Sequence, residues 1–436
     1  MAGWHSDMRI DHLQVQNFRC FEATAFDFSP GFNLFVGVNG AGKTSLLMAV
    51  TASLATPILG LGVSHQWLHA QEQNARLALL KLDGKVRYER CYPVRLEVDG
   101  LVGEQSRHWW MEESGPGSNQ TKFEHTTLKA LVDQAAAIAQ GGPGALPVLA
   151  FYTAERQWQL KGIGADAAVQ QKESRLDGYR SWHDAALDSK GLETWVIAKS
   201  LERLEAASLG QTHGKPDELE LVNRAVAQAV PDALGLRYDI KLRRLVLDWQ
   251  DSDPMPFDTL SDGQRGVAAL AADIARRMAL LNPQLGSAVL TETPGVVLID
   301  ELDMHLHPAW QRRLPGVLKA TFPRVQFIVA SHSPQIMGEL QPEEIWLMRG
   351  ATVLGHPETA LGLSSNEVLE ALMGTEARNP AVAEKLSCIR RLIDDDHIQQ
   401  AQRELDVLQT NVGDIPGVVE LQSAIHSLQW LGDDGA

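Results

Sequence analysis

The feature that most constrains this chain is a glycine-rich segment at residues 37–44, GVNGAGKT, which fits the pattern GxxxxGK[ST]. Glycines allow the backbone to curl so that successive N–H groups point into one concavity, and a following helix adds its positive N-terminal end. An apolar strand leads into this segment, and an apolar helix over residues 44–54 follows it. The segment therefore predicts a phosphate-binding loop in an α/β fold.

The loop predicts ATP and Mg²⁺ as ligands. We expect Lys43 to reach the β- and γ-phosphates and the Thr44 hydroxyl to bind Mg²⁺. The other loop residues that we expect to contact ATP are Asn39, Gly40, Gly42 and Ser45.

A second segment, residues 296–301, has the sequence VVLIDE. A continuous apolar run of this kind is typical of a central parallel strand covered on both faces, and ligands in such sheets bind beyond the carboxyl ends of the strands. Asp300 is therefore a predicted Mg²⁺ ligand, and Glu301 is the predicted general base for the attacking water. The alternative is a strand that simply ends in two solvated acids.

Two shorter motifs stand on either side of these acids. The segment LSDGQR at residues 260–265 opens a helix, and ASHSP at residues 330–334 ends an apolar strand. With four motifs in this order, the chain resembles the ATPase heads of ABC type, in the branch that includes RecF, SMC-like and OLD-like proteins. The resemblance implies an α/β fold with a mixed central sheet and flanking helices, and hydrolysis of ATP to ADP and phosphate.

The resemblance assigns a role to LSDGQ, which departs from the LSGGQ signature of the family at Asp262. In that family the signature of one subunit closes on ATP bound to the other, so a homodimer of heads or a higher oligomer is implied. The residues that would act in trans are Ser261, Gly263 and Gln264. Taken alone, the segment is more typical of an N-capped helix start.

The resemblance also assigns His332 as the switch histidine, catalytic together with Glu301 and Lys43. Taken alone, a histidine at a strand end is more often a hydrogen-bonded structural residue. His305 and His307 form an HxH pair, but the sequence offers no third ligand, so no metal site is predicted there.

Arg19 and Gln157 are further candidates. The segment NFRCF at residues 17–21 resembles the element that opens RecF- and SMC-like heads. Arg19 either contacts the phosphates of ATP or is a solvated arginine at a strand end. Gln157 is a candidate for the glutamine that links ATP to the inserted lobe of such heads.

We expect four regions along the chain. An N-terminal lobe of the head (1–154) holds the phosphate loop, and a mainly helical insertion (155–235) follows it. A C-terminal lobe (236–350) holds the signature, the acidic strand end and the histidine. The last region (351–436) is expected to be a helical C-terminal extension.

Three segments indicate a narrower group: residues 146–152 (LPVLAFY), 174–179 (SRLDGY) and 300–311. They look like the ATPase subunit of Septu-type anti-phage defence systems, and similar ATPases accompany some retrons. In those systems the ATPase acts with a separate HNH nuclease, so such a partner is implied. No nuclease centre is expected in this chain, because Asp394–Asp396, the acid cluster after residue 350, lies at a helix end. The alternatives are a RecF-like DNA repair ATPase and an ATP-binding scaffold with little turnover.

Composition limits the partners. The formal net charge is −16, and residues 351–436, with 5 basic and 14 acidic residues, contribute −9 of it. Nucleic acid would therefore have to bind through a local basic patch. No run approaches the roughly 18 apolar residues of a membrane helix, so no membrane association is expected. The separated cysteines and the absence of a secretory signal favour the cytoplasm.

Overall fold

The computed structural model describes residues 7–433 apart from 62–72, 83–84, 104, 116–120, 124, 143, 159–167, 169–172, 211–216 and 376–377. The described chain divides into two compact units, residues 1–364 and 365–436.

A six-stranded sheet forms the centre of the first unit, in the order β16-β15-β3-β14-β13-β9. Its strands are β3 (Phe32–Gly37), β9 (Val148–Tyr152), β13 (Gly295–Ile299), β14 (Val325–Ala330), β15 (Ile345–Arg349) and β16 (Thr352–Gly355). The four pairs from β15 to β9 are parallel, and β16 is antiparallel to β15. This arrangement confirms the predicted mixed central sheet. Strand β16 lies within the range that the sequence predicted to be helical.

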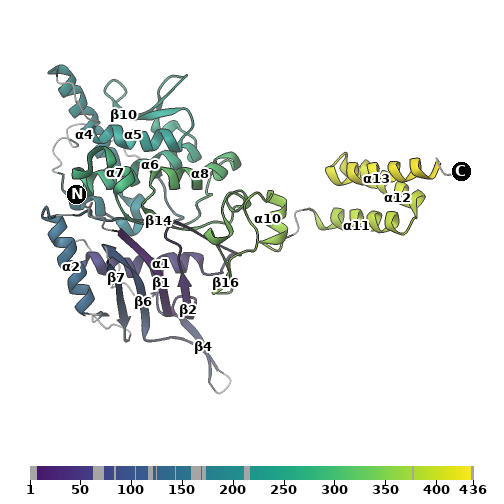
Figure 1. The fold of residues 1–436 in the computed structure, drawn as a ribbon, viewed down its shortest axis with the longest axis horizontal. Helices are drawn as coiled ribbons and strands as arrows, with labels where there is room; N and C mark the ends of the chain where they lie inside the picture. The colour runs from purple at the N-terminus through teal and green to yellow at the C-terminus, as the bar shows by residue number, and fades with distance from the viewer. Residues whose placement is uncertain are drawn as a thin grey trace. The chain divides into compact units, whose positions relative to one another are not determined.

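A second, antiparallel sheet has the order β2-β1-β6-β7-β8. Its strands are β1 (Asp7–Phe18), β2 (Phe21–Asp27), β6 (Val94–Gly103), β7 (Gln105–Glu113) and β8 (Thr121–Phe123). Helix α1 (Lys43–Ala55) contacts strands of both sheets, and its residues are buried on nearly all sides. A helix that is apolar all round can only be stable when it is covered on every face, which explains its place between the two sheets (Figure 1).

The other face of the six-stranded sheet is covered by helices (Figure 1). The long helices here are α4 (Ser189–Ser208), α5 (Glu218–Ala229), α6 (Asp262–Leu281) and α8 (Pro308–Thr321). The other described helices and strands of this unit are α2 (His125–Ala139), α7 (Val289–Glu292), α9 (Pro334–Met337), β4 (Leu77–Leu82), β5 (Lys85–Arg90), β10 (Ala233–Asp239), β11 (Arg244–Trp249) and β12 (Met255–Pro256). Short 3₁₀ helices cover residues 56–61, 175–179, 182–188, 257–259, 283–288 and 342–344.

A buried cluster of charges ties α6 to its surroundings. Asp273 accepts hydrogen bonds from Arg276 (2.7 Å) and Arg277 (2.7 Å), and Arg276 also pairs with Asp188 (2.6 Å). All four side chains are almost fully buried. The Tyr152 hydroxyl, at the end of β9, donates to Asp273 at 2.9 Å. Burial by itself raises the pKa of Asp273, but the two guanidinium groups outweigh it and the pKa lies below its ordinary value.

The second unit is helical. It consists of α10 (Ser365–Ala371), α11 (Pro380–Asp394), α12 (Ile398–Val412) and α13 (Pro416–Asp433). The Asn379 side chain caps α11, and Pro380 is its first residue. Leu386, Ile389, Leu405 and Ile425 lie in the shared core of α11–α13. Among the described helices of the whole chain, none is long and apolar enough to cross a membrane.

Candidate functional site

The phosphate loop joins β3 to α1, and its glycines are required for different reasons. Gly40 (φ +80°) and Gly42 (φ +101°) adopt the left-handed conformation, which residues with a Cβ atom rarely adopt. Gly37 is needed for space instead, because a Cβ atom there would lie 2.4 Å from the carbonyl oxygen of Met348 in β15. The neighbouring strand therefore approaches the start of the loop closely.

The N-terminal end of α1 and Lys43 give this loop its positive charge. Among the described residues no side chain caps α1, so the first N–H groups of this helix are left for a ligand. The Lys43 ammonium donates to the carbonyl oxygens of Gly37 (2.8 Å) and Val38 (3.4 Å) and is almost fully buried. Burial lowers the pKa of Lys43, although the nearby carboxylates Asp300 and Glu301 oppose the shift. These features fit an anion with several negative charges.

The two predicted Mg²⁺ ligands are in contact. The Thr44 hydroxyl donates to the Asp300 carboxylate at 2.7 Å, although the two residues are 256 positions apart in the sequence. Asp300 is buried directly after β13, whereas Thr44 is exposed at the start of α1. A hydroxyl and a carboxylate side by side are oxygen ligands of the kind that Mg²⁺ prefers. The residues present therefore fit a magnesium ion.

Glu301 is exposed and has a left-handed backbone, with φ +48°. This conformation costs a residue with a Cβ atom about 1–2 kcal/mol. The guanidinium of Arg156 donates to the backbone carbonyl of Glu301 (2.7 Å) and also to that of Asp300. Hydrogen bonds from a charged donor are worth about 1.5–3 kcal/mol each, so the two bonds are strong enough to offset the unfavourable backbone.

Asp303 connects the acidic loop, the segment 300–307 between β13 and α8, to His332. Its carboxylate accepts hydrogen bonds from the Ser331 hydroxyl and from the backbone N–H of His332 (3.4 Å). Burial lowers the pKa of the His332 imidazole, and the Lys43 ammonium lowers it further. The neutral form of His332 therefore predominates at pH 7. The structure thus brings Lys43, Thr44, Asp300, Glu301 and His332 into one region.

The predicted signature residues begin α6. Ser261 and Gln264 form a reciprocal capping box, so the Ser261 hydroxyl is engaged within this helix start. A Cβ atom on Gly263 would lie 2.7 Å from the carbonyl oxygen of His305, so glycine allows the acidic loop to approach α6. Asp262, where the family signature has glycine, forms an ion pair with Arg265.

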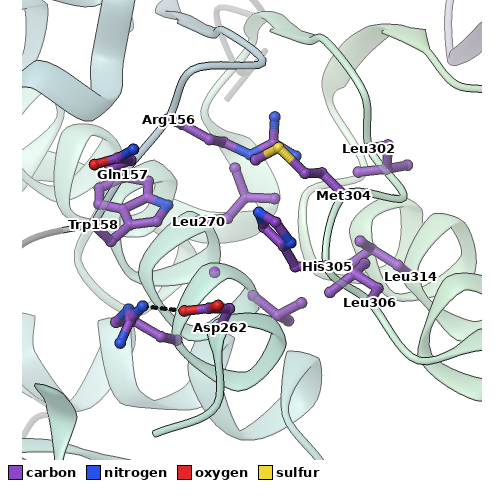
Figure 2. Close-up of a pocket in the computed structure, with 13 residues that line it drawn as sticks. Arg156, Gln157, Trp158, Asp262, Leu270, Leu302, Met304, His305, Leu306 and Leu314 are labelled. Atoms are coloured by element: carbon purple, nitrogen blue, oxygen red, sulfur yellow. Dashed lines mark hydrogen bonds and ion pairs between the residues drawn. The ribbon is translucent and has the colours of Figure 1, made fainter. Parts of the chain in front are cut away.

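A pocket of about 310 Å³ lies between the segment after β9 and the start of α6 (Figure 2). Arg156, Gln157 and Trp158 line one side, and Leu302 with residues 304–306 of the acidic loop lines another. Gln157 therefore lies beside the signature helix and the acidic loop. In the described residues, no group of three or more His, Cys, Asp or Glu side chains is arranged to hold a metal ion. His305 and His307 are both exposed.

Arg19 lies in the turn between β1 and β2, against the phosphate-loop helix. Its guanidinium contacts the sulfur of Met48 in α1, and its backbone is left-handed (φ +52°). The adjacent residues Cys20 and Phe21 are close to Gly42, where a Cβ atom would lie 3.0 and 2.9 Å from them. The contact of Arg19 with phosphate stays a prediction.

Two sequence families match the chain. The family described as "AAA domain, putative AbiEii toxin, Type IV TA system" matches residues 151–338. The family described as "AAA domain" matches residues 12–206. Together the two matches extend over both sides of the nucleotide site.

Several known proteins are similar to the chain. The Retron Ec83 probable ATPase of Escherichia coli is 39% identical, over 86% of this chain and 77% of that protein. The Retron Vc95 probable ATPase of Vibrio cholerae serotype O1 biovar El Tor is 45% identical, over 78% and 73%. The Septu protein PtuA of Bacillus thuringiensis is 26% identical, over 38% and 46%. Among solved structures, the SMC head bound to the C-winged helix domain of ScpA covers 81% of this chain and 98% of that chain, with 15% identity and a TM-score of 0.46.

Proposed function

The chain belongs to the family of retron ATPases, and from this premise we propose that it binds and hydrolyses ATP at a site formed by Lys43, Thr44 and Asp300. We further propose that it acts as the regulatory subunit of an anti-phage defence complex. The observation that carries the proposal is the contact between the Thr44 hydroxyl and the Asp300 carboxylate. It joins the phosphate loop to the acidic strand end, the two parts that phosphoryl transfer with Mg²⁺ requires.

Each residue of the site has a proposed role in hydrolysis. Lys43 and the N-terminal end of α1 offset the charge of the β- and γ-phosphates. Thr44 and Asp300 hold Mg²⁺, which when bound neutralises the charge that develops on the phosphates. Glu301 accepts a proton from the attacking water. His332, mainly in its neutral form at pH 7, forms a hydrogen bond with the γ-phosphate or with that water.

The active site is proposed to be shared between two copies of the chain. The exposed N-terminal end of α6, with Ser261, Gly263 and Gln264, would meet the phosphates bound by a second copy. The Ser261 hydroxyl already accepts from the Gln264 N–H, so the support for this assignment is limited to the first N–H groups of α6, which precede Gln264. The assembly is accordingly a homodimer of heads or a higher oligomer.

The partner of the complex is proposed to be a separate HNH nuclease. The support is the resemblance to Septu-type systems and the 26% identity to the Septu protein PtuA. Any contact with nucleic acid by this chain would use a local basic patch, because the whole chain is acidic.

The test of the ATPase site is phosphate release and nucleotide affinity in the purified chain with ATP and Mg²⁺. Lys43→Ala should lose ATP binding, because the cation beside the phosphates is removed. Lys190→Ala is the matched control, since Lys190 is exposed in α4. Unchanged ATP affinity in Lys43→Ala would refute the phosphate-loop assignment.

Co-purification with an HNH protein encoded beside this chain tests the proposed partner. Failure to co-purify with ATP present would count against the nuclease partner alone and not against the ATPase site.

A further inference from the structure

We infer that Arg156 is a positioning residue for ATP hydrolysis, because it holds the backbone of Asp300 and Glu301 and thereby sets the direction of the Glu301 carboxylate. This inference rests on the proposed role of Glu301 as general base. It adds a residue that belongs to none of the recognised motifs of the site.

The hydrogen bonds of Arg156 go to backbone rather than to carboxylates. Its guanidinium donates to the carbonyl oxygens of Thr153 (3.1 Å), Asp300 and Glu301 (2.7 Å). The planar guanidinium offers several N–H donors in a fixed geometry, so it holds consecutive carbonyls in a defined orientation. The carboxylate of Glu301 is thereby left for the attacking water.

The backbone at Glu301 is one that needs to be held. Its φ of +48° is uncommon for a residue with a Cβ atom, and His305, at the other end of the same turn, is also left-handed (φ +61°). Without the bonds to the carbonyl oxygens, rotation at Glu301 toward an ordinary conformation would swing the carboxylate away from its present direction. The left-handed backbone and the arginine that binds it therefore form one local unit.

Arg156 is itself fixed to the sheet. It follows β9, which is paired with β13 in parallel register, and the backbone N–H of Asp300 donates to the Tyr152 carbonyl at 2.9 Å. The Tyr152 hydroxyl donates to the buried Asp273 of α6. The segment from Tyr152 to Arg156 thus connects the acidic loop to the helix that begins with the signature. A side chain anchored in this way keeps its partner within the small tolerance that catalysis requires.

The first measurement is steady-state ATP hydrolysis with ATP affinity measured separately. Arg156→Ala should lower kcat on the order of 10²-fold, the typical effect of displacing a catalytic group by about 1 Å. Arg156→Lys keeps the charge and N–H donors but loses the planar arrangement that holds both carbonyls, so its kcat should fall less than that of Arg156→Ala. ATP affinity should stay near the wild-type value in both variants, because Lys43, Thr44 and Asp300 remain.

The decisive measurement places each Arg156 variant in a Glu301→Gln background. If Arg156 acts through Glu301, its substitution there should lower kcat by no more than about twofold, since effects of coupled residues are not additive. If the Arg156 substitution lowers kcat by the same factor in the Glu301→Gln background as in the wild-type background, the positioning role is overturned. If Arg156→Ala does not fold, the comparison of Arg156→Lys with and without Glu301→Gln decides the question.

Arg175→Ala is the matched control. Arg175 also donates to two backbone carbonyls, those of Leu281 (2.9 Å) and Ile138 (2.9 Å). Neither of these two partners belongs to the acidic loop. Its loss should lower the melting temperature without lowering kcat. A kcat loss in Arg175→Ala as large as that in Arg156→Ala would show that both act through stability alone and would overturn the inference. Wild-type turnover by Glu301→Gln would instead refute the proposed base itself.

Discussion

Replacement of Asp273 by asparagine should destabilise the first unit while leaving the residues of the nucleotide site in place. Asp273 is fully buried and is shared by Arg276 and Arg277, which are also buried. Asparagine keeps the volume, and its oxygen can still accept from Tyr152 and Arg277, but its NH2 group then faces the donors of Arg276. The change therefore removes the negative charge and one acceptor oxygen. Two guanidinium groups then remain buried, and among the residues that the structure describes only Asp188 still pairs with one of them.

The magnitude follows from this burial. Removing one partner of a buried ion pair costs about 3–5 kcal/mol. Unfolding entropy is about 2.1 cal/mol/K per residue, so a unit of 364 residues gains roughly 0.8 kcal/mol/K on unfolding. The melting temperature should therefore fall by about 4–7 °C. Because the pKa of Asp273 lies below its ordinary 3.8, this difference should persist at all higher pH and narrow only as the pH falls below 3.8.

Thermal unfolding followed by circular dichroism measures this shift. Nucleotide is left out, because a ligand raises the melting temperature by mass action. Asp258→Asn is the matched control: Asp258 pairs with Arg244 at 3.1 Å, with 49% and 56% of the two side chains exposed. Exposed pairs contribute about 0–1 kcal/mol, so the control should shift by about 1 °C or less. Equal shifts in the two variants would refute the reasoning.

Further predictions concern the site. Glu301→Gln should bind ATP normally and hydrolyse it on the order of 10²–10⁴-fold more slowly, as measured by phosphate release; wild-type turnover would remove Glu301 from its role. A mixture of the Lys43→Ala and Ser261→Arg proteins should regain at most roughly a quarter of wild-type hydrolysis, because random pairing gives about half heterodimers, each with one intact site. Normal hydrolysis by the Ser261→Arg protein alone would contradict a shared site. The rate of ATP hydrolysis by His332→Gln, divided by the wild-type rate, should be constant between about pH 7 and 8, since burial and Lys43 lower the pKa of His332 below 6.5. A step in this ratio within that pH range would argue against a neutral imidazole.

Local sequence patterns predicted much of the head. The phosphate loop, the strand before it and the apolar helix after it could be recognised because each depends on neighbouring residues. The strand that ends in Asp300 was predictable for the same reason. Once both strands are placed in one parallel sheet, the proximity of Asp300 to the phosphate loop follows from the edge that they share.

The contacts of Arg156 could not be predicted in this way. They depend on β9 lying beside β13, a pairing between distant segments of the chain that no local pattern encodes. The same holds for two glycines: Gly37 is required by the carbonyl of Met348 and Gly263 by that of His305, and both partners are distant in the sequence. The one signal for Arg156 was its position just after an apolar strand in the same sheet, at the carboxyl edge where ligands bind.

The order of the central strands has a consequence for synthesis of the protein. Strand β3 lies between β14 and β15, so Phe32 is paired with Phe327, roughly 300 residues later in the chain. At about 5–20 residues per second, a ribosome needs roughly 15–60 s to make the intervening chain. During that time the phosphate loop has emerged without the two strands that flank β3 in the finished sheet. The earliest segment of the nucleotide site is thus completed by some of the latest residues of the head, and nascent chains that end before β14 are in no position to bind ATP as the finished protein does.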